Sequence, residues 1–162
     1  MIHQKISYVE TRAFPSCESS KLLILDRDGV INEDSHGYFY DKNNIIYIKK
    51  NLRLIKEYVY HGWVLCVATN QSGIGRGIYS QKIFIDLCET MFRDLLKENI
   101  VIHRWYFCPH NPEIETCNCR KPSPAMLLKA INDFKPTEAI FIGDKSSDRD
   151  AAENAGIKFI KV

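Results

Sequence analysis

The sequence predicts an α/β fold in which helices cover both faces of a parallel sheet. Short apolar runs alternate with longer segments whose apolar residues recur every three or four positions, as buried strands alternate with amphipathic helices. The polar residues that could carry chemistry gather directly after the apolar runs. In sheets of this kind ligands bind beyond the carboxyl ends of the strands, so these polar clusters are expected to meet at one site.

Length and composition restrict the class of protein. The chain has 162 residues, enough for one domain that buries about 70% of its unfolded surface. No apolar run approaches the ~18 residues of a membrane span, so we expect no membrane partner. The formal charge of +2 neither demands nor excludes nucleic acid, but the sequence shows no basic groove, so we expect no nucleic-acid partner. The N-terminus lacks an apolar signal segment, which predicts a cytoplasmic protein with reduced cysteines, and we expect a monomer.

The elements follow in order along the chain. Residues 1–20 carry little pattern and form a lead-in, with a short strand near 6–9, to a single domain over 21–162. The first buried strand is Leu22 to Leu25, and residues 33–48 around an Asp-Lys-Asn-Asn turn form a hairpin-like flap. Asn51 and Ser80 are the expected N-caps of the first two helices. The remaining strands are expected over 63–68, 100–107, 139–142 and 157–161, and the helices over 52–60, 81–98, 124–133 and 148–155.

Two carboxylates, Asp26 and Asp28, follow the first strand directly. Spaced at i and i+2, they point the same way if strand geometry persists, and like charges that close raise each other's pKa. This arrangement suits a metal-assisted nucleophile and its acid/base partner. Taken alone, the stretch could equally be a solvated strand end with two surface acids.

A second cluster joins Cys108, His110, Cys117 and Cys119 within twelve residues. Three thiolates and one imidazole complete a tetrahedral set for Zn²⁺ with no open position, which predicts a structural site. A disulfide pair is the alternative, although a reducing compartment favours metal. The loop over 108–119 ends directly at Arg120 and Lys121, so a bound zinc would fix the position of two cations.

Four motifs now stand in order after successive strands: Asp26-Arg27-Asp28-Gly29, Thr69, Lys121 and Gly143-Asp144-Lys145-Ser146-Ser147-Asp148. This set resembles the haloacid-dehalogenase (HAD) superfamily of phosphatases over residues 22–162. The resemblance implies a Rossmann-like, HAD-type sheet, and the chain has no room for a large cap domain.

The resemblance also implies a role for each carboxylate. Asp26 would attack phosphorus to form an aspartyl-phosphate, while Asp28 would protonate the leaving oxygen and then activate water. A Mg²⁺ would lie between Asp26, the Asp28 carbonyl and Asp144, since hard oxygen ligands suit it. Asp148 would hold a metal-bound water, with a helix-terminal acid as the alternative.

Thr69 and Lys121 would hold the phosphoryl oxygens, because an acid cluster without such donors would repel a phosphate. Taken singly, Thr69 could be an ordinary strand-end hydroxyl and Lys121 a solvated lysine.

Within the superfamily, the zinc loop resembles the heptose bisphosphate 7-phosphatase and histidinol-phosphatase families. Local matches at 26–32, 36–38 and 70–77 favour the heptose enzymes, which act in the synthesis of nucleotide-activated heptose for lipopolysaccharide. An extra residue before the 36–38 segment and a short zinc loop depart from that pattern. By resemblance, the substrate contacts are Asp34, His36, Gly37, Tyr38, Thr69, Asn70, Gln71, Ser72, Arg120 and Lys145.

Three other functions remain open at this point. Histidinol phosphate carries an ammonium and an imidazole, so its binding would require a carboxylate near the flap, which Glu33 or Asp34 could supply. His36 could also have no substrate contact and only make a hydrogen bond within the flap. The 69–77 stretch also resembles the 3′-phosphatase half of polynucleotide kinases, but those lack the cysteine loop and the sequence has no basic groove. The third alternative is a phosphoacceptor module without turnover, which would not need Asp28 as a leaving-group acid.

Arg120 favours a substrate with a second phosphate, because its guanidinium forks onto phosphate oxygens.

Overall fold

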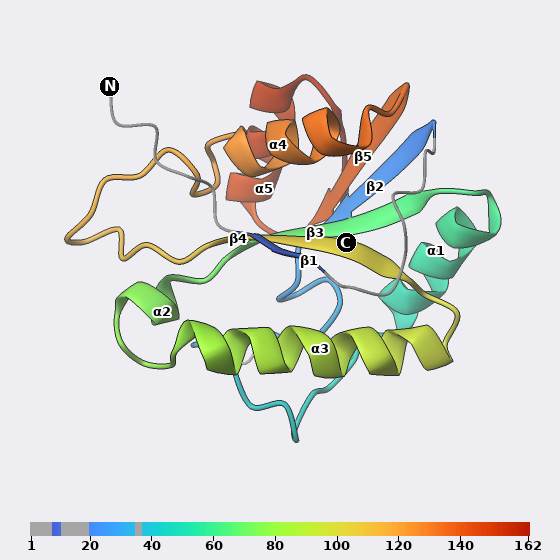
Figure 1. Ribbon diagram of the computed structural model, residues 1–162. Coiled ribbons are helices and arrows are strands. Elements are labelled where there is room, and N and C mark those ends of the chain that lie inside the picture. The colour runs from blue at the N-terminus through green and yellow to red at the C-terminus, as the bar shows by residue number, and fades with distance from the viewer. Residues whose placement is uncertain (1–7, 11–19, 35–36) are drawn as a thin grey trace.

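The structure, a computed structural model, describes residues 8–10, 20–34 and 37–162. Its sheet has the strand order β1-β4-β3-β2-β5-β6, and all neighbouring strands are parallel except the pair β1 and β4 (Figure 1). The nucleophile candidate therefore follows a strand, β2, that lies in the interior of the sheet. The strands are β1 (Tyr8–Glu10), β2 (Lys21–Leu25), β3 (Val64–Asn70), β4 (Ile102–Cys108), β5 (Glu138–Gly143) and β6 (Lys158–Lys161).

The predicted parallel sheet is thus confirmed for β2 to β6, and the lead-in adds an edge strand whose direction was not predicted. β1 pairs antiparallel with β4, Val9 opposite Trp105. β1 lies at the edge of the sheet, so only one of its sides pairs with another strand. The strand expected at 6–9 overlaps β1 at residues 8 and 9, and residues 6 and 7 lie outside the described part of the chain.

Helices cover both faces of the sheet, as the sequence predicted. Figure 1 shows α3 below the sheet and α4 and α5 above it, with α1 on the same side as α3. No helix in the described ranges is both long and apolar enough to span a membrane. The helices are α1 (Lys49–Tyr60), α2 (Ser72–Gly75), α3 (Gln81–Lys97), α4 (Ala125–Phe134) and α5 (Ser146–Ala155).

Strand β2 contributes to two apolar clusters at once. Leu23 and Leu25 belong to the cluster under α1 and α3, while Leu22 and Ile24 belong to the cluster under α4 and α5. Successive side chains of a strand point to opposite faces, so four consecutive apolar residues are needed to fill both. A one-residue slip would exchange the two faces and displace the carboxylates that follow.

The two expected helix caps have different outcomes. The Ser80 side chain accepts a hydrogen bond from the Ile83 amide at 3.2 Å and caps α3, as predicted. Asn51 is not a cap, because α1 begins at Lys49 and Asn51 is buried within its first turn. The Asn51 amide instead donates to the Val30 carbonyl at 3.0 Å, which fastens α1 to the turn after β2.

The segment 33–48, here called the flap, returns on itself without regular strands in its described part. The Glu33 amide donates to the Ile46 carbonyl at 2.9 Å, and Asn32 and Tyr47 form an isolated bridge. At the tip, the Asn43 amide donates to the Asp41 carboxylate at 2.9 Å. The hairpin-like outline is therefore confirmed, and the turn falls where the sequence predicted it.

Candidate active site

The carboxyl ends of the central strands surround one cavity of about 400 Å³. It collects side chains from the loops after β2, β3, β4 and β5 together with the flap, as expected for a parallel sheet. The predicted residues on its wall are Asp26, Asp28, Asp34, Gly37, Tyr38, Thr69, Asn70, Gln71, Ser72, Arg120, Lys121, Lys145 and Asp148. His36 lies outside the described residues.

Asp26 lies directly after β2, and its amide donates to the Ile142 carbonyl of β5 at 2.9 Å. Its side chain is buried, and burial raises the pKa of Asp26 to about 6, although the nearby Lys121 ammonium opposes this shift and Asp148 and Asp28 add to it. A carboxylate held in this way gains from any further cation that approaches it. The position therefore suits a nucleophile that works beside a metal.

Lys121 is the cation at the floor of the site. Its Nζ lies 3.0 Å from Asp26 Oδ1 and 2.7 Å from Asp148 Oδ1, and it donates to the Ala68 carbonyl at 2.9 Å. Asp148 is fully buried, and its other oxygen accepts from the Asp144 and Lys145 amides at 3.2 and 3.1 Å. Asp148 thus orients Lys121 and holds the start of α5, while its expected contact with a metal-bound water stays a prediction.

Asp28 is held by three side chains, two from the turn after β2 and one from the turn after β3. Arg27 binds it in a forked ion pair, Nε to Oδ1 at 2.9 Å and Nη2 to Oδ2 at 2.7 Å. Asn32 donates to Oδ1 at 3.0 Å and Gln71 to Oδ2 at 3.2 Å. Burial disfavours the charge of Arg27, yet Asp28 outweighs this and raises the pKa of Arg27.

The sequence analysis assigned no role to Arg27 or Asn32. The only signal in the sequence was their place within the Asp26 to Asn32 motif.

Thr69 is the second-last residue of β3, and Gln71 links it to Asp28. Its Oγ1 accepts a hydrogen bond from Gln71 Nε2 at 2.8 Å, which leaves the hydroxyl proton to be donated into the cavity. Gln71 Oε1 accepts from the Tyr79 hydroxyl at 2.6 Å. Asn70 uses both ends of its amide on the Lys121 backbone, at 3.0 and 3.1 Å. Gln71 and Asn70 were expected as substrate contacts, and their hydrogen bonds also position Thr69 and Lys121 in the cavity wall.

Three carboxylates converge where the resemblance places Mg²⁺. Oxygens of Asp26, Asp144 and Asp148 all lie within 4.8 Å of one another. Asp144 Oδ1 is buried with no hydrogen-bond partner among the described residues, and burial raises the pKa of Asp144. An unpartnered buried oxygen in a set of hard ligands fits a divalent cation such as Mg²⁺. The Asp28 carboxylate lies outside this set, and the expected role of its backbone carbonyl as a ligand stays a prediction.

Gly29 allows this approach of carboxylates. Its φ of +81° lies in the left-handed region, and a Cβ at this position would lie 2.3 Å from Asp144 Oδ2. Both constraints exclude a larger residue. The glycine of the Asp26 to Gly29 motif is thus required by the packing of the carboxylates.

Cations beyond Lys121 line the outer part of the cavity. Lys145 Nζ lies 2.8 Å from Asp34 Oδ2, an ion pair that joins the flap to the start of α5. Arg120 Nη1 is buried without a hydrogen-bond partner in the described part of the chain. A guanidinium nitrogen in that state fits an anionic ligand, because buried polar atoms are normally satisfied.

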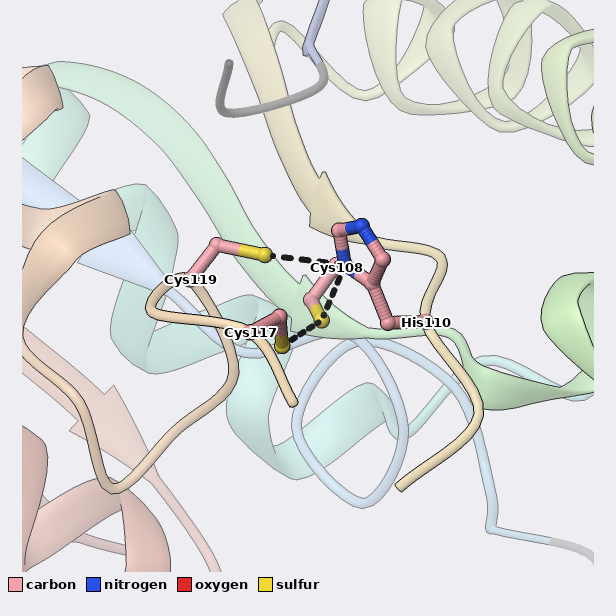
Figure 2. Close-up of side chains that lie close together, drawn as sticks. All are labelled: Cys108, His110, Cys117 and Cys119. Carbon is pink, nitrogen blue, oxygen red and sulfur yellow. Dashed lines mark hydrogen bonds between the residues drawn. The ribbon is translucent and has the colours of Figure 1, made fainter. Parts of the chain in front are cut away.

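The four predicted zinc ligands point toward one another from the loop after β4 (Figure 2). Cys108 Sγ lies 3.6 Å from Cys117 Sγ and 3.5 Å from His110 Nδ1, and Cys119 Sγ lies 3.2 Å from the same nitrogen. A disulfide needs sulfurs about 2 Å apart, whereas Zn–S bonds of about 2.3 Å in a tetrahedron hold ligand atoms at spacings close to these. The residues therefore fit zinc, with Nδ1 as the imidazole ligand.

The same cluster is electrostatically prepared for a cation. The hydrogen bond with the Cys119 thiol has the largest effect on the Cys108 thiol. Together with the hydrogen bond to the His110 ring it outweighs burial and lowers the pKa of Cys108 to about 5. The pKa of Cys119 is raised by its contact with Cys108 and by burial. Neighbouring thiols that share protons in this way lose them together when a metal binds.

The zinc loop also contacts the turn after β3. The Gly75 amide donates to the Pro109 carbonyl and the Gln71 amide to the Cys108 carbonyl, both at 2.8 Å. A Cβ on Gly75 would lie 2.5 Å from the Asn111 amide, so α2 and the loop are in direct backbone contact. The sequence analysis did not predict α2, a four-residue helix that contains two glycines.

Comparisons with known proteins agree with these observations. The HAD-hydrolase-like family model matches residues 118–162. The chain is 42% identical over 140 residues to D-glycero-alpha-D-manno-heptose-1,7-bisphosphate 7-phosphatase of Campylobacter jejuni, covering 85% of this chain and 79% of that protein. It is 38% identical over 146 residues to D-glycero-beta-D-manno-heptose-1,7-bisphosphate 7-phosphatase of Haemophilus influenzae, covering 86% and 79%.

Solved structures give the same picture. D,D-heptose 1,7-bisphosphate phosphatase from B. bronchiseptica, complexed with magnesium and phosphate, superposes with a TM-score of 0.79 at 33% identity, covering 86% of this chain and 78% of that chain. A HAD-like phosphatase from Mesorhizobium loti superposes with a TM-score of 0.83 at 27% identity, covering 97% and 78%. The HAD-type fold that the sequence predicted is confirmed.

Proposed function

The chain belongs to the heptose 1,7-bisphosphate 7-phosphatase family of HAD phosphatases, and from this membership we propose that it removes the 7-phosphate of D-glycero-D-manno-heptose 1,7-bisphosphate. The relatives from C. jejuni and H. influenzae carry that activity in their names. One structural observation carries the proposal: Asp26, Lys121 and Asp28 face a single cavity at the end of the central strands. The reaction class is the hydrolysis of a phosphate monoester.

In the proposed first step, Asp26 attacks phosphorus and the bond to the sugar oxygen breaks. Lys121, 3.0 Å from Asp26, supplies a positive charge beside the attacking carboxylate, and the Thr69 hydroxyl donates to a phosphoryl oxygen. Asp28 gives its proton to the leaving alkoxide, which becomes the primary hydroxyl of the product. A primary alkoxide is a poor leaving group, so this proton transfer lowers the barrier.

In the proposed second step, water attacks the aspartyl-phosphate on Asp26. Asp28, now ionised, accepts a proton from that water, and Asp26 leaves as a carboxylate while inorganic phosphate forms. Asp26, Asp144 and the Asp28 carbonyl would hold Mg²⁺, which neutralises charge on the phosphoryl oxygens when bound. The neighbour from B. bronchiseptica contains magnesium and phosphate, which supports Mg²⁺ as the metal.

Replacing the proposed nucleophile tests the mechanism. Asp26→Asn keeps the size of the side chain but cannot form the acyl phosphate, so we expect turnover to fall by about 10⁴-fold or more. Release of inorganic phosphate from heptose bisphosphate measures the loss, and circular dichroism checks the fold. Asp150→Asn on the surface of α5 is the matched control and should keep parental activity. An Asp26→Asn variant with near-parental turnover would exclude the aspartyl-phosphate route.

The cations around the cavity support a substrate with a second phosphate. Arg120 has a buried unpartnered nitrogen, and Lys145 adds charge on the opposite segment. Asp34 is already paired with Lys145 at 2.8 Å, so it is less free to accept the ammonium of histidinol phosphate. The contacts therefore favour the sugar bisphosphate over the alternative substrate, and Arg120 is the proposed partner of the phosphate that is not cleaved.

Arg120 can be tested by comparing two substrates. Arg120→Ala should lower kcat/KM for heptose 1,7-bisphosphate more than for the same sugar with only the 7-phosphate. The extra loss of transition-state stabilisation should be about 1.5–3 kcal/mol, because a charge-assisted contact is lost only in the bisphosphate. Both anomers and histidinol phosphate belong in the same assay. Equal losses on both sugars, or a parental preference for histidinol phosphate, would overturn the substrate assignment.

A further inference from the structure

The residue between the two motif carboxylates, Arg27, has no part in the chemistry described above. We propose that Arg27 is a positioning residue that holds the acid/base Asp28 against the flap. This inference rests on the proposed phosphatase function, since it concerns the carboxylate that moves protons in both steps. It assigns Arg27 no contact with the transferred phosphoryl group.

The hydrogen bonds of Arg27 have the geometry of a clamp, while its third nitrogen, Nη1, is buried with no hydrogen-bond partner among the described residues. Its Nε and Nη2 lie 2.9 and 2.8 Å from Asp28 Oδ1, and Nη2 also lies 2.7 Å from Oδ2. The same Nη2 donates to the Phe39 carbonyl of the flap at 2.9 Å. A planar guanidinium fixes the plane of a carboxylate as a single ammonium cannot. One nitrogen of Arg27 therefore joins the acid/base candidate to the flap backbone.

Burial keeps this clamp rigid. Arg27 is only 1% exposed, and its Cζ lies 6.0 Å from the Phe39 ring centre and 5.5 Å from that of Phe84. The two rings belong to the flap and to α3, so the guanidinium lies between elements that are distant in sequence. A buried charge is costly unless it is paired, and removing one partner is strongly destabilising. Arg27 and Asp28 are therefore expected to move as one unit.

A second chain of contacts joins the same carboxylate to the flap. Gln71 donates to Asp28 Oδ2 at 3.2 Å and accepts from the Tyr79 hydroxyl at 2.6 Å. The Tyr79 ring stacks on Tyr40 of the flap with centroids 5.1 Å apart. Asp28 is thus tied to the flap on two sides, through Arg27 to Phe39 and through Gln71 and Tyr79 to Tyr40.

This double attachment has a chemical consequence. Asp28 must meet the leaving oxygen in the first step and a water molecule in the second, and a displacement of about 1 Å can cost about 10²-fold in rate. The flap contributes proposed substrate contacts, Gly37 and Tyr38, to the same cavity. Arg27 therefore makes the orientation of Asp28 depend on the position of the flap.

The test replaces the fork by a point charge. Arg27→Lys keeps the positive charge but cannot fix the plane of Asp28, so kcat for heptose 1,7-bisphosphate should fall by about 10²-fold. KM and the inhibition constant of inorganic phosphate should stay at parental values, because the hydrogen bonds of Arg27 go to Asp28 and Phe39 and the lysine keeps the positive charge at the cavity wall. An unchanged kcat, or a phosphate inhibition weakened in proportion to the loss of kcat, would overturn the inference.

Leaving-group chemistry gives a second readout. The nitrophenolate of 4-nitrophenyl phosphate leaves without a proton, so kcat/KM for this ester should fall in Arg27→Lys far less than for the sugar phosphate. A role in folding alone would lower both values together. Arg104→Lys is the matched control, because Arg104 also pairs with an aspartate, Asp133, beneath a phenyl ring but does not line the cavity.

A milder variant covers the case in which Arg27→Lys does not fold. Phe39→Ala removes one ring from the guanidinium and keeps the backbone carbonyl, and it should shift the ratio between the two substrates in the same direction. Parental kinetics with Phe39→Ala would count against the proposal. A parent that cleaves no phosphate monoester would instead overturn the proposed function, so the two failures are distinguishable.

Discussion

Two aspartates, the buried Asp26 and the partly buried Asp133, show how the same side chain is adapted to opposite tasks. Burial raises the pKa of Asp26, since the single nearby ammonium of Lys121 does not compensate fully. For Asp133, burial acts in the same direction, but hydrogen bonds from Lys129, Tyr106 and Arg104 outweigh it and lower the pKa. The first carboxylate retains a demand for positive charge, as a metal-assisted nucleophile should. The second is fully satisfied and serves stability.

Asp133 allows a prediction about stability and pH. Arg104 Nη1 lies 2.9 Å and the Tyr106 hydroxyl 2.8 Å from Asp133 Oδ2, which joins α4 to β4. Because its folded pKa is lowered, the ionised carboxylate contributes stability above the unfolded pKa of about 3.9 and loses it as the pH falls through the folded value. Asp133→Asn should therefore cost about 1–3 kcal/mol near pH 7. Urea unfolding should show this difference shrinking below about pH 4.

The control for Asp133 is an exposed ion pair with the same i to i+4 spacing as Lys129 and Asp133. Lys82 and Asp86 lie at i and i+4 on α3, 3.3 Å apart, and the Lys82 side chain is 83% exposed. Asp86→Asn should change the free energy of unfolding by less than about 1 kcal/mol at any pH tested. A loss of stability in Asp133→Asn that stays constant down to pH 2 would contradict the assigned ionisation.

At the scale of elements, the zinc loop is a connection that lacks regular structure of its own. It runs from the end of β4 to Arg120 and is joined to α2 by the backbone contacts of Gly75 and Gln71. Four side chains that converge on one point hold it together, which is how short loops without a core are ordered. Metal binding in this loop should therefore be coupled to the position of Arg120 and Lys121.

Elemental analysis tests the loop directly. Protein purified without chelator should contain about one zinc per chain, as a closed four-ligand site does. Cys119→Ser should lower the zinc content and also kcat/KM, because Cys119 precedes the two cations in the chain. Cys88→Ala removes a thiol from α3 and should keep the zinc content unchanged. Metal-free, reduced protein with full activity would exclude a role for zinc in positioning.

The elements differ in how far the sequence could predict them. Strands β2 and β3 are long apolar runs buried on both faces, and α3 has a cap and four apolar residues at helical spacing, so all three were predicted correctly. The direction of β1 and the short helix α2 were not, because edge pairing and single turns depend on neighbours rather than on local pattern. Asn51 was taken for a cap because its partner, the Val30 carbonyl, is distant in sequence.

For the whole molecule, the sequence could predict which residues come together in the candidate site. It could not predict the hydrogen bonds and ion pairs among them. A parallel sheet brings the ends of its strands together, so Asp26, Thr69, Lys121 and Asp144 had to approach one another once the fold was known. The pairing of Arg27 with its sequence neighbour depends on how the chain turns after β2. No periodicity reports such a turn. Tyr79 likewise reaches Gln71 only because α2 is so short.

The residues of the candidate site form two groups, those attached to the sheet by hydrogen bonds and those on the connecting segments. The proposed nucleophile and phosphate-binding groups, Asp26, Thr69 and Lys121, are tied by backbone or side-chain hydrogen bonds to the ends of β2, β3 and β5. Residues that could recognise the rest of a substrate, such as Tyr38 and Arg120, lie on connecting segments. Loops tolerate insertions and replacements that a central sheet does not. New substrate preferences can therefore evolve in this scaffold by exchanging surface loops, while the phosphate-cleaving machinery is inherited unchanged.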